Sequence, residues 1–171
     1  MYFKIVEQFG PKNGEAWLKY LSSRGLQLDC FDSVDGILRA DTFVPATNED
    51  WDNVLIAEDK PSLLNSYQHA LKVYRGLSGV DLVGVDIDVQ KEFKPEQGLL
   101  GYEVIDSYWD VSILTNWGSD EEGLLSHHIE NNGLISSLNT ALSVRDIIQS
   151  RFPEDSHACE CSVWAVYAVS T

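Results

Sequence analysis

Two carboxylates have the spacing of metal ligands. Asp86 and Asp88 alternate in GVDLVGVDIDV, so a strand would place both on one face, about 7 Å apart. Hard oxygen ligands of this kind suit divalent cations. Such sites usually act on a phosphate-bearing substrate, and the chain has no glycine-rich phosphate loop. We therefore assign no metal to this pair, although metal binding stays open as an alternative.

A second candidate for metal chemistry is the run HACEC. On a strand, His157, Cys159 and Cys161 would share one face and could hold zinc if a fourth ligand came from elsewhere. The run lacks a C-x-x-C pair, and the apolar alternation that follows it is typical of a core strand. The chain also has no G-x-S-x-G motif around a nucleophile. We predict no catalytic residue and no cofactor, with a small hydrolase or metal-dependent enzyme as the alternative.

The charge distribution is the strongest global feature. The chain has 12 basic and 27 acidic residues, a formal net charge of −15. Residues 29–59 carry nine acids and one base, and residues 81–123 carry eleven acids and two bases. Such blocks repel nucleic acids and anionic membranes and attract basic surfaces. The predicted partner is therefore a basic protein, not a nucleic acid or a membrane.

The elements that must position these residues alternate between helical and strand patterns. Helices are predicted over residues 14–25, 61–76 and 134–152, each with apolar residues at three- and four-residue steps. Strands are predicted over residues 1–7, 26–31, 36–44, 79–89, 99–105, 111–117 and 159–170. The last of these has apolar residues on both faces, which favours a central position in the sheet. The chain is thus expected to be one α+β domain over residues 1–171, with a mostly antiparallel sheet and about three helices packed on it.

The stretch GYEVIDSYWDVSILTNWG, residues 101–118, reads as a hairpin. Alternation anchors its strands through aliphatic residues, and the connecting turn at residues 106–110 holds two aromatics between two acids. Tyrosine and tryptophan are favoured in the centres of protein interfaces. The predicted partner-binding residues are Asp86, Asp88, Glu103, Asp106, Tyr108, Trp109, Asp110, Asp120, Glu121 and Glu122.

The segments GYEVID and SILTNWG, together with the acidic character, resemble immunity proteins of bacterial contact-dependent growth inhibition and related polymorphic toxin systems. The resemblance covers only residues 101–118 and brings no site residues with it. It implies a cognate toxin domain, often a basic nuclease, that is blocked in a one-to-one complex. Carboxylates would there take the place of substrate phosphates and accelerate association.

The expected function is therefore an acidic inhibitor of a basic toxin domain. A ligand-binding regulatory module that uses the same hairpin is a further alternative. The N-terminal residues lack the pattern of a signal peptide, and no apolar run approaches the ~20 residues needed to span a bilayer. Three cysteines, an odd number, argue against a disulfide scaffold. These features favour the cytoplasm, and the oligomeric state stays open.

Overall fold

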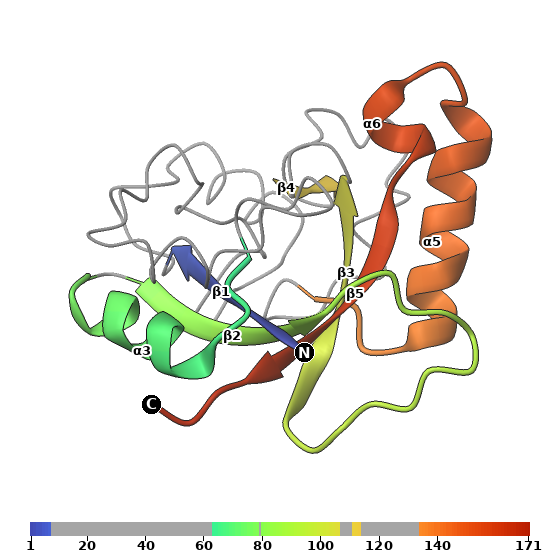
Figure 1. The fold of residues 1–171 in the computed structure, drawn as a ribbon. Coiled ribbons are helices and arrows are strands. Elements are labelled where there is room, and N and C mark those ends of the chain that lie inside the picture. Colours follow the sequence, from blue (N-terminus) through green and yellow to red (C-terminus); the bar gives the residue numbers. More distant parts are fainter. Residues whose placement is uncertain (8–62, 79, 107–110, 114–133) are drawn as a thin grey trace, which may run out of the picture.

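The computed structural model describes residues 1–7, 63–78, 80–106, 111–113 and 134–171 (Figure 1). The elements within them, in chain order, are β1 (Tyr2–Glu7), α3 (Tyr67–Arg75), β2 (Val80–Asp86), β3 (Leu99–Asp106), β4 (Val111–Ser112), α5 (Leu138–Arg151), α6 (Ser156–Cys159) and β5 (Ser162–Ala168). This part of the chain is α+β, as predicted. The helix predicted over residues 14–25 and the strands predicted over 26–31 and 36–44 lie outside the described residues, so the total of about three helices stays a prediction.

The strands form one antiparallel sheet with the order β1-β2-β5-β3-β4. The last strand of the chain, β5, inserts between β2 and β3 and is central, which confirms the prediction from its two apolar faces. Trp164 and Val166 are buried on one face of β5, and Val163 and Ala165 are buried on the other. Because both faces are buried, β5 determines how the flanking strands are placed.

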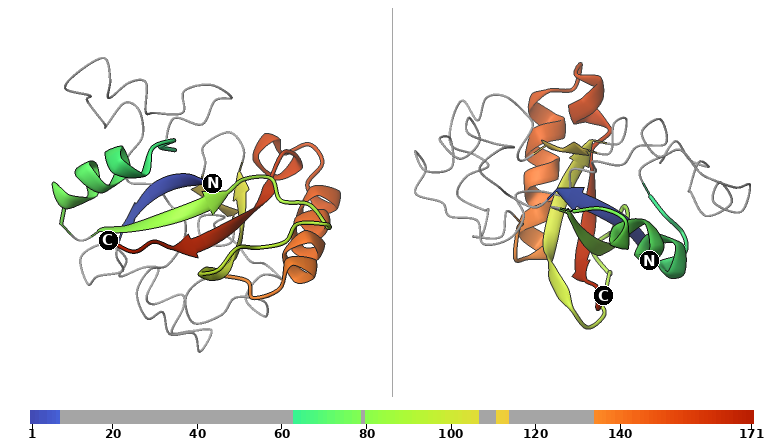
Figure 2. Two further views of the ribbon diagram at one scale, coloured as in Figure 1. Left: turned by 60° about the horizontal axis from the view of Figure 1, so that its bottom comes forward. Right: turned by 90° about the vertical axis from the view of Figure 1, so that its left-hand side faces the viewer.

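Strand pairing puts Leu82, which packs with α3, and Tyr167, which packs with α5, on the same face of the sheet. The two helices lie at different places along the sheet (Figure 1). Helix α5 contributes Ala141, Val144 and Ile148 to a cluster with residues of β3 and β5. Helix α3 packs through Ala70 and Leu71 against β1 and β2. The two further views show α5 beside β3 and β5, and α3 beside β1 and β2 (Figure 2). A second apolar cluster, which includes residues of β2, β3 and β5, occupies the opposite face of the sheet.

Both helices begin later than the sequence pattern predicts, for the same physical reason. The backbones of Leu64 and Phe3 exchange two hydrogen bonds of 2.8 Å, and those of Ile135 and Tyr102 exchange bonds of 2.8 and 2.7 Å. Leu64 and Ile135, which precede the two helices, are therefore bound to strands of the sheet and cannot enter the helices. The apolar residues before each helix are buried, which explains why they extend the helical pattern.

Two strand predictions also need correction. Strand β2 ends at Asp86, and Asp88 lies beyond it with φ of 49°, a left-handed conformation that aspartate tolerates better than most residues. The two carboxylates are therefore not on one strand face. Likewise, β5 begins at Ser162, and Cys159 ends the short helix α6. The predicted alternation of HACEC along a strand is wrong.

The hairpin prediction is confirmed for the residues that the structure describes. Strands β3 and β4 pair antiparallel, with Ile105 opposite Ser112 and Asp106 opposite Val111. The predicted alternation along β3 also holds: Glu103 and Ile105 share one face, and Tyr102 and Val104 share the other. Of the second predicted strand, β4 covers only residues 111–112. The turn residues 107–110 lie outside the described residues.

Candidate partner-binding site

The ends of β2 and β3 lie at the same end of the sheet. Both strands are antiparallel to β5, so they run parallel to one another on its two sides. The N–H of Val89 donates to the carbonyl of Val163 at 2.8 Å, and Val104 pairs with the same Val163 from the other side. With strands spaced about 4.8 Å apart, the two backbones are about 10 Å apart there. The structure thus brings Asp88 and the start of the hairpin turn to one region.

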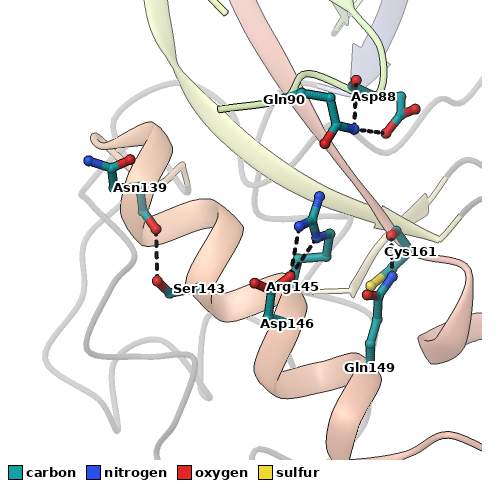
Figure 3. A network of polar contacts seen from close by, with 8 residues as sticks. All are labelled: Asp88, Gln90, Asn139, Ser143, Arg145, Asp146, Gln149 and Cys161. Atoms are coloured by element: carbon teal, nitrogen blue, oxygen red, sulfur yellow. Dashed lines mark hydrogen bonds and ion pairs between the residues drawn. The ribbon is translucent and has the colours of Figure 1, made fainter. Parts of the chain in front are cut away.

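Asp86 and Asp88 occupy different environments in this region. The Asp86 carboxylate lies 3.0 Å from the amino group of Met1, and both groups are about a quarter exposed. Asp88 is exposed, and its Oδ1 accepts a hydrogen bond of 2.8 Å from Nε2 of Gln90 (Figure 3). In the part of the chain that the structure describes, no group of three or more His, Cys, Asp or Glu residues is placed to hold a metal ion.

Glu103 and Asp106 are buried rather than displayed. Glu103 is fully buried in β3, opposite Trp164, and its Oε1 accepts a hydrogen bond of 3.0 Å from the N–H of Val104. Asp106 is only 4 % exposed. A surface that contacts a partner would therefore not include their side chains in this conformation. The other predicted contact residues, at 108–110 and 120–122, lie outside the described residues.

Further exposed acids lie at the same end of the sheet, where sequence analysis did not look for them. Helix α5 and α6 lead into β5 at this end (Figure 1). Asp146 lies on α5, Glu154 lies in the turn between α5 and α6, and Glu160 follows α6; the side chains of all three are exposed. Arg145 is held by Asp146, whose Oδ1 accepts from its Nε and Nη2 at 2.9 and 2.7 Å (Figure 3). These acids were missed because they come from outside the two acidic blocks and only the fold places them here.

We call Asp88, Asp146, Glu154 and Glu160 the acidic end. All four are exposed, and each belongs to a helix, or to a turn next to a helix or strand of the central sheet. Of the described basic residues, Arg145 and Arg151 lie on α5 in the same segment as three of these acids, Lys91 and Lys94 are in the loop after Asp88, and Lys72 and Arg75 are in the last turn of α3. The acidic end therefore lies beside two arginines, of which Arg145 is paired with Asp146.

The face of the sheet opposite the helices contains a buried cation that the sequence did not reveal. Lys4 is fully buried, and its Nζ lies 5.6 Å from the centroid of the Trp164 ring. The indole Nε1 of Trp164 donates to the hydroxyl of Ser162 at 3.0 Å. Because strand pairing puts Glu103 opposite Trp164, this tryptophan has a carboxylate residue on one side and an ammonium on the other. Only the alternation of MYFKIVE, which puts Lys4 at an inward position, could have indicated this.

The thiol of Cys161, the residue just before β5, is expected to be unreactive. Burial raises the pKa of the Cys161 thiol to about 12, against the opposing effect of the nearby Arg145 cation. Its backbone carbonyl accepts a hydrogen bond of 3.0 Å from Gln149 of α5 (Figure 3). A thiol with so high a pKa is protonated at neutral pH and is a poor nucleophile or metal ligand. This geometry gives Cys161 a packing role.

Comparisons with known proteins identify no relative. No protein-family description, curated protein or solved structure matches the chain significantly. Among the helices of the described residues, none combines the length and apolar character that a membrane span requires.

Proposed function

We propose that this chain is a cytoplasmic inhibitor that binds a basic protein, most specifically an immunity protein that blocks a toxin nuclease in a one-to-one complex. The single observation that supports this best is the acidic end, whose four exposed carboxylates lie in the two chain segments that flank the start of β5, the turn after β2 and residues 146–160. Carboxylates on a rigid scaffold can occupy the phosphate positions of a nuclease without being cleaved.

The net charge bears on the rate at which the chain would associate with a basic partner. The described residues carry twelve acidic and seven basic side chains, so most of the net charge of −15 resides in the remaining residues. A field of this sign accelerates encounter with a basic surface and weakens with added salt. Immunity against a toxin that acts inside the cell requires fast capture, which this charge favours.

The first test uses the gene next to the one that encodes this chain. The proposal expects that gene to encode a large secreted protein with a basic C-terminal domain. Co-expression of the two should yield a complex of one copy each by light scattering, and the added chain should abolish nucleic-acid cleavage by the domain. A neighbouring toxin domain that stays active and unbound in the presence of excess chain would contradict the proposal.

The contribution of the acidic end can be separated from that of overall charge. Asp88→Asn with Glu160→Gln removes two charges from the acidic end, whereas Glu92→Gln with Glu96→Gln removes two from the exposed loop between β2 and β3. Asparagine suits the left-handed backbone at position 88. We expect the first pair to weaken capture at least tenfold and the second to change it less than threefold. Equal losses would mean that only net charge matters.

A further inference from the structure

One backbone N–H on the outer edge of β3 lies between two paired positions. Tyr102 exchanges two hydrogen bonds with Ile135 on the side of β3 that faces away from β5. Because alternate residues of a strand direct their N–H and C=O groups to the same side, Val104 and Asp106 also point to this outer edge. Asp106 lies opposite Val111 of β4 there. The N–H of Val104 is therefore left between the pairing with Ile135 and the pairing with β4.

A longer β4 would give this N–H an acceptor. In β4, Ser112 lies opposite Ile105. The same register would place Ile113 opposite Val104, and the two backbones would exchange hydrogen bonds. The sequence pattern predicts such a strand, over residues 111–117. In the structure β4 ends at Ser112 and Ile113 has a helical conformation, so this pair is not formed.

The carboxylate of Glu103 supplies the acceptor instead. Its Oε1 accepts a hydrogen bond of 3.0 Å from the N–H of Val104, and both residues are fully buried. A buried backbone N–H that lacks an acceptor destabilises a fold, so a strand pairing that stops in the interior needs such a group. A carboxylate is also a stronger acceptor than a neutral carbonyl. The contact therefore favours a strand that ends at Ser112 over one that continues.

We propose that Glu103 is a positioning residue of the hairpin: its carboxylate takes the place that the Ile113 carbonyl would hold in the pairing, and so ends β4 at Ser112. Ile113, which the pairing does not hold, packs in the same apolar cluster as Val104. This role gives a reason for an acid at a fully buried position opposite Trp164. It does not depend on a partner, and only its consequence for capture rests on the proposed function.

The bond can be observed directly in the wild-type chain. Long-range HNCO spectroscopy at pH 7 correlates a donor nitrogen with the carbon of its hydrogen-bond acceptor. We expect a correlation from the Val104 nitrogen to the side-chain Cδ of Glu103. The correlation from the Tyr102 nitrogen to the Ile135 carbonyl carbon is the positive control. A correlation from Val104 to the Ile113 carbonyl carbon, or none to either acceptor while the control is seen, would overturn the proposal.

Two substitutions separate the acceptor from the charge. Glu103→Gln keeps an oxygen acceptor of the same reach, whereas Glu103→Leu removes the acceptor and keeps a side chain of similar size. Amide exchange at Val104 should be at least tenfold faster in Glu103→Leu and change less than threefold in Glu103→Gln. The control amide is that of Tyr102, which should change less than threefold in both.

Each other outcome of this comparison also decides the matter. Slow exchange at Val104 in Glu103→Leu, together with a new correlation to the Ile113 carbonyl carbon, would support the proposal, because β4 would then extend once the carboxylate is removed. Unchanged exchange without that correlation would overturn it. Equal acceleration in Glu103→Gln and Glu103→Leu would assign the effect to the charge and would overturn it as well.

Capture of the toxin domain distinguishes a positioning residue from a contact residue. Glu103→Gln removes a charge, yet should leave the association rate and its salt dependence within threefold of the wild type, whereas Glu103→Leu should weaken capture at least tenfold. A loss in Glu103→Gln as large as that in Asp88→Asn with Glu160→Gln would make Glu103 a contact and overturn the proposal. Unchanged capture by Glu103→Leu would overturn the link to capture. If the wild-type chain does not bind the domain, the proposed function fails, while the NMR results still decide the role of Glu103.

Discussion

Among the glycines that the structure describes, Gly101 is the one at which an added methyl group should cost the fold most. It lies in β3 with φ of 155°, a conformation that side-chain-bearing residues rarely adopt. A Cβ there would come within 2.8 Å of the Leu134 Cβ and 2.9 Å of the Ile135 carbonyl oxygen. The second contact is with backbone, so it cannot be relieved by rotating a side chain. Gly101 therefore lets the segment before α5 approach the sheet.

The expected effect of Gly101→Ala has two causes, the unfavourable backbone conformation and the overpacking against residues 134–135. Backbone strain of this kind costs about 1–3 kcal/mol, and overpacking costs about as much again, so the sum is roughly 2–6 kcal/mol. With a urea dependence of about 2 kcal/mol per molar, the denaturation midpoint should fall by about 1–3 M. The neighbouring hydrogen bonds between Tyr102 and Ile135 should also lose protection from amide exchange.

Gly76 provides the matched control. It caps α3 with φ of −85°, and a Cβ there would meet only the Val73 carbonyl oxygen at 3.4 Å and a more distant carbonyl. Gly76→Ala should leave the free energy of unfolding unchanged or raise it by up to about 1 kcal/mol, because alanine restricts the unfolded chain. Urea unfolding followed by circular dichroism measures both variants. A Gly101→Ala chain as stable as the wild type, or equal losses in both variants, would refute this account of the β3 contact.

Two further predictions concern the helix caps and the cysteines. Ser66 Oγ accepts a hydrogen bond of 3.3 Å from the N–H of His69, so Ser66→Ala should lower the free energy of unfolding in urea by roughly 1 kcal/mol. Ser137 makes no such cap bond, so Ser137→Ala should lower it by less than about 0.5 kcal/mol. Equal costs would contradict the cap assignment. In the folded chain a thiol reagent at pH 7 should modify Cys159 well before Cys161, which is buried. Burial raises the pKa of Cys161 to about 12 in the folded chain, whereas the unfolded-state pKa is about 8.5. The stabilisation that comes from keeping this thiol protonated is therefore complete below pH 8.5. It is lost as the pH rises from there towards 12, by up to about 1.4 kcal/mol per pH unit. Cys161→Ala should have a shallower decline between pH 8.5 and 10, and an identical decline would contradict the assignment.

The sequence predicted those features that depend on local alternation. The two-sided apolar pattern of β5 gave its central position, and the alternation in residues 101–106 gave the faces of β3. Helix ends were less predictable because they depend on distant strands. Nothing near Leu64 or Ile135 indicates that their backbones bind Phe3 and Tyr102, so both helices were expected to begin too early.

The candidate site could be predicted only in part for a similar reason. Charge counting found Asp88, but it also included Glu103, whose burial is set by the pairing of β3 with β5. It missed Glu160 because that residue reaches the acidic end through the placement of β5, not through its local composition.

The measurement that tests the central claim most directly is the association rate with the neighbouring toxin domain as a function of salt. Stopped-flow fluorescence at increasing NaCl compares the wild type, Asp88→Asn with Glu160→Gln, and Glu92→Gln with Glu96→Gln. The proposal predicts a rate for the wild type that falls steeply with salt, a shallower slope when the acidic end is neutralised, and nearly the wild-type slope for the loop variant. A rate that does not change with salt, or identical slopes for all three chains, would contradict it.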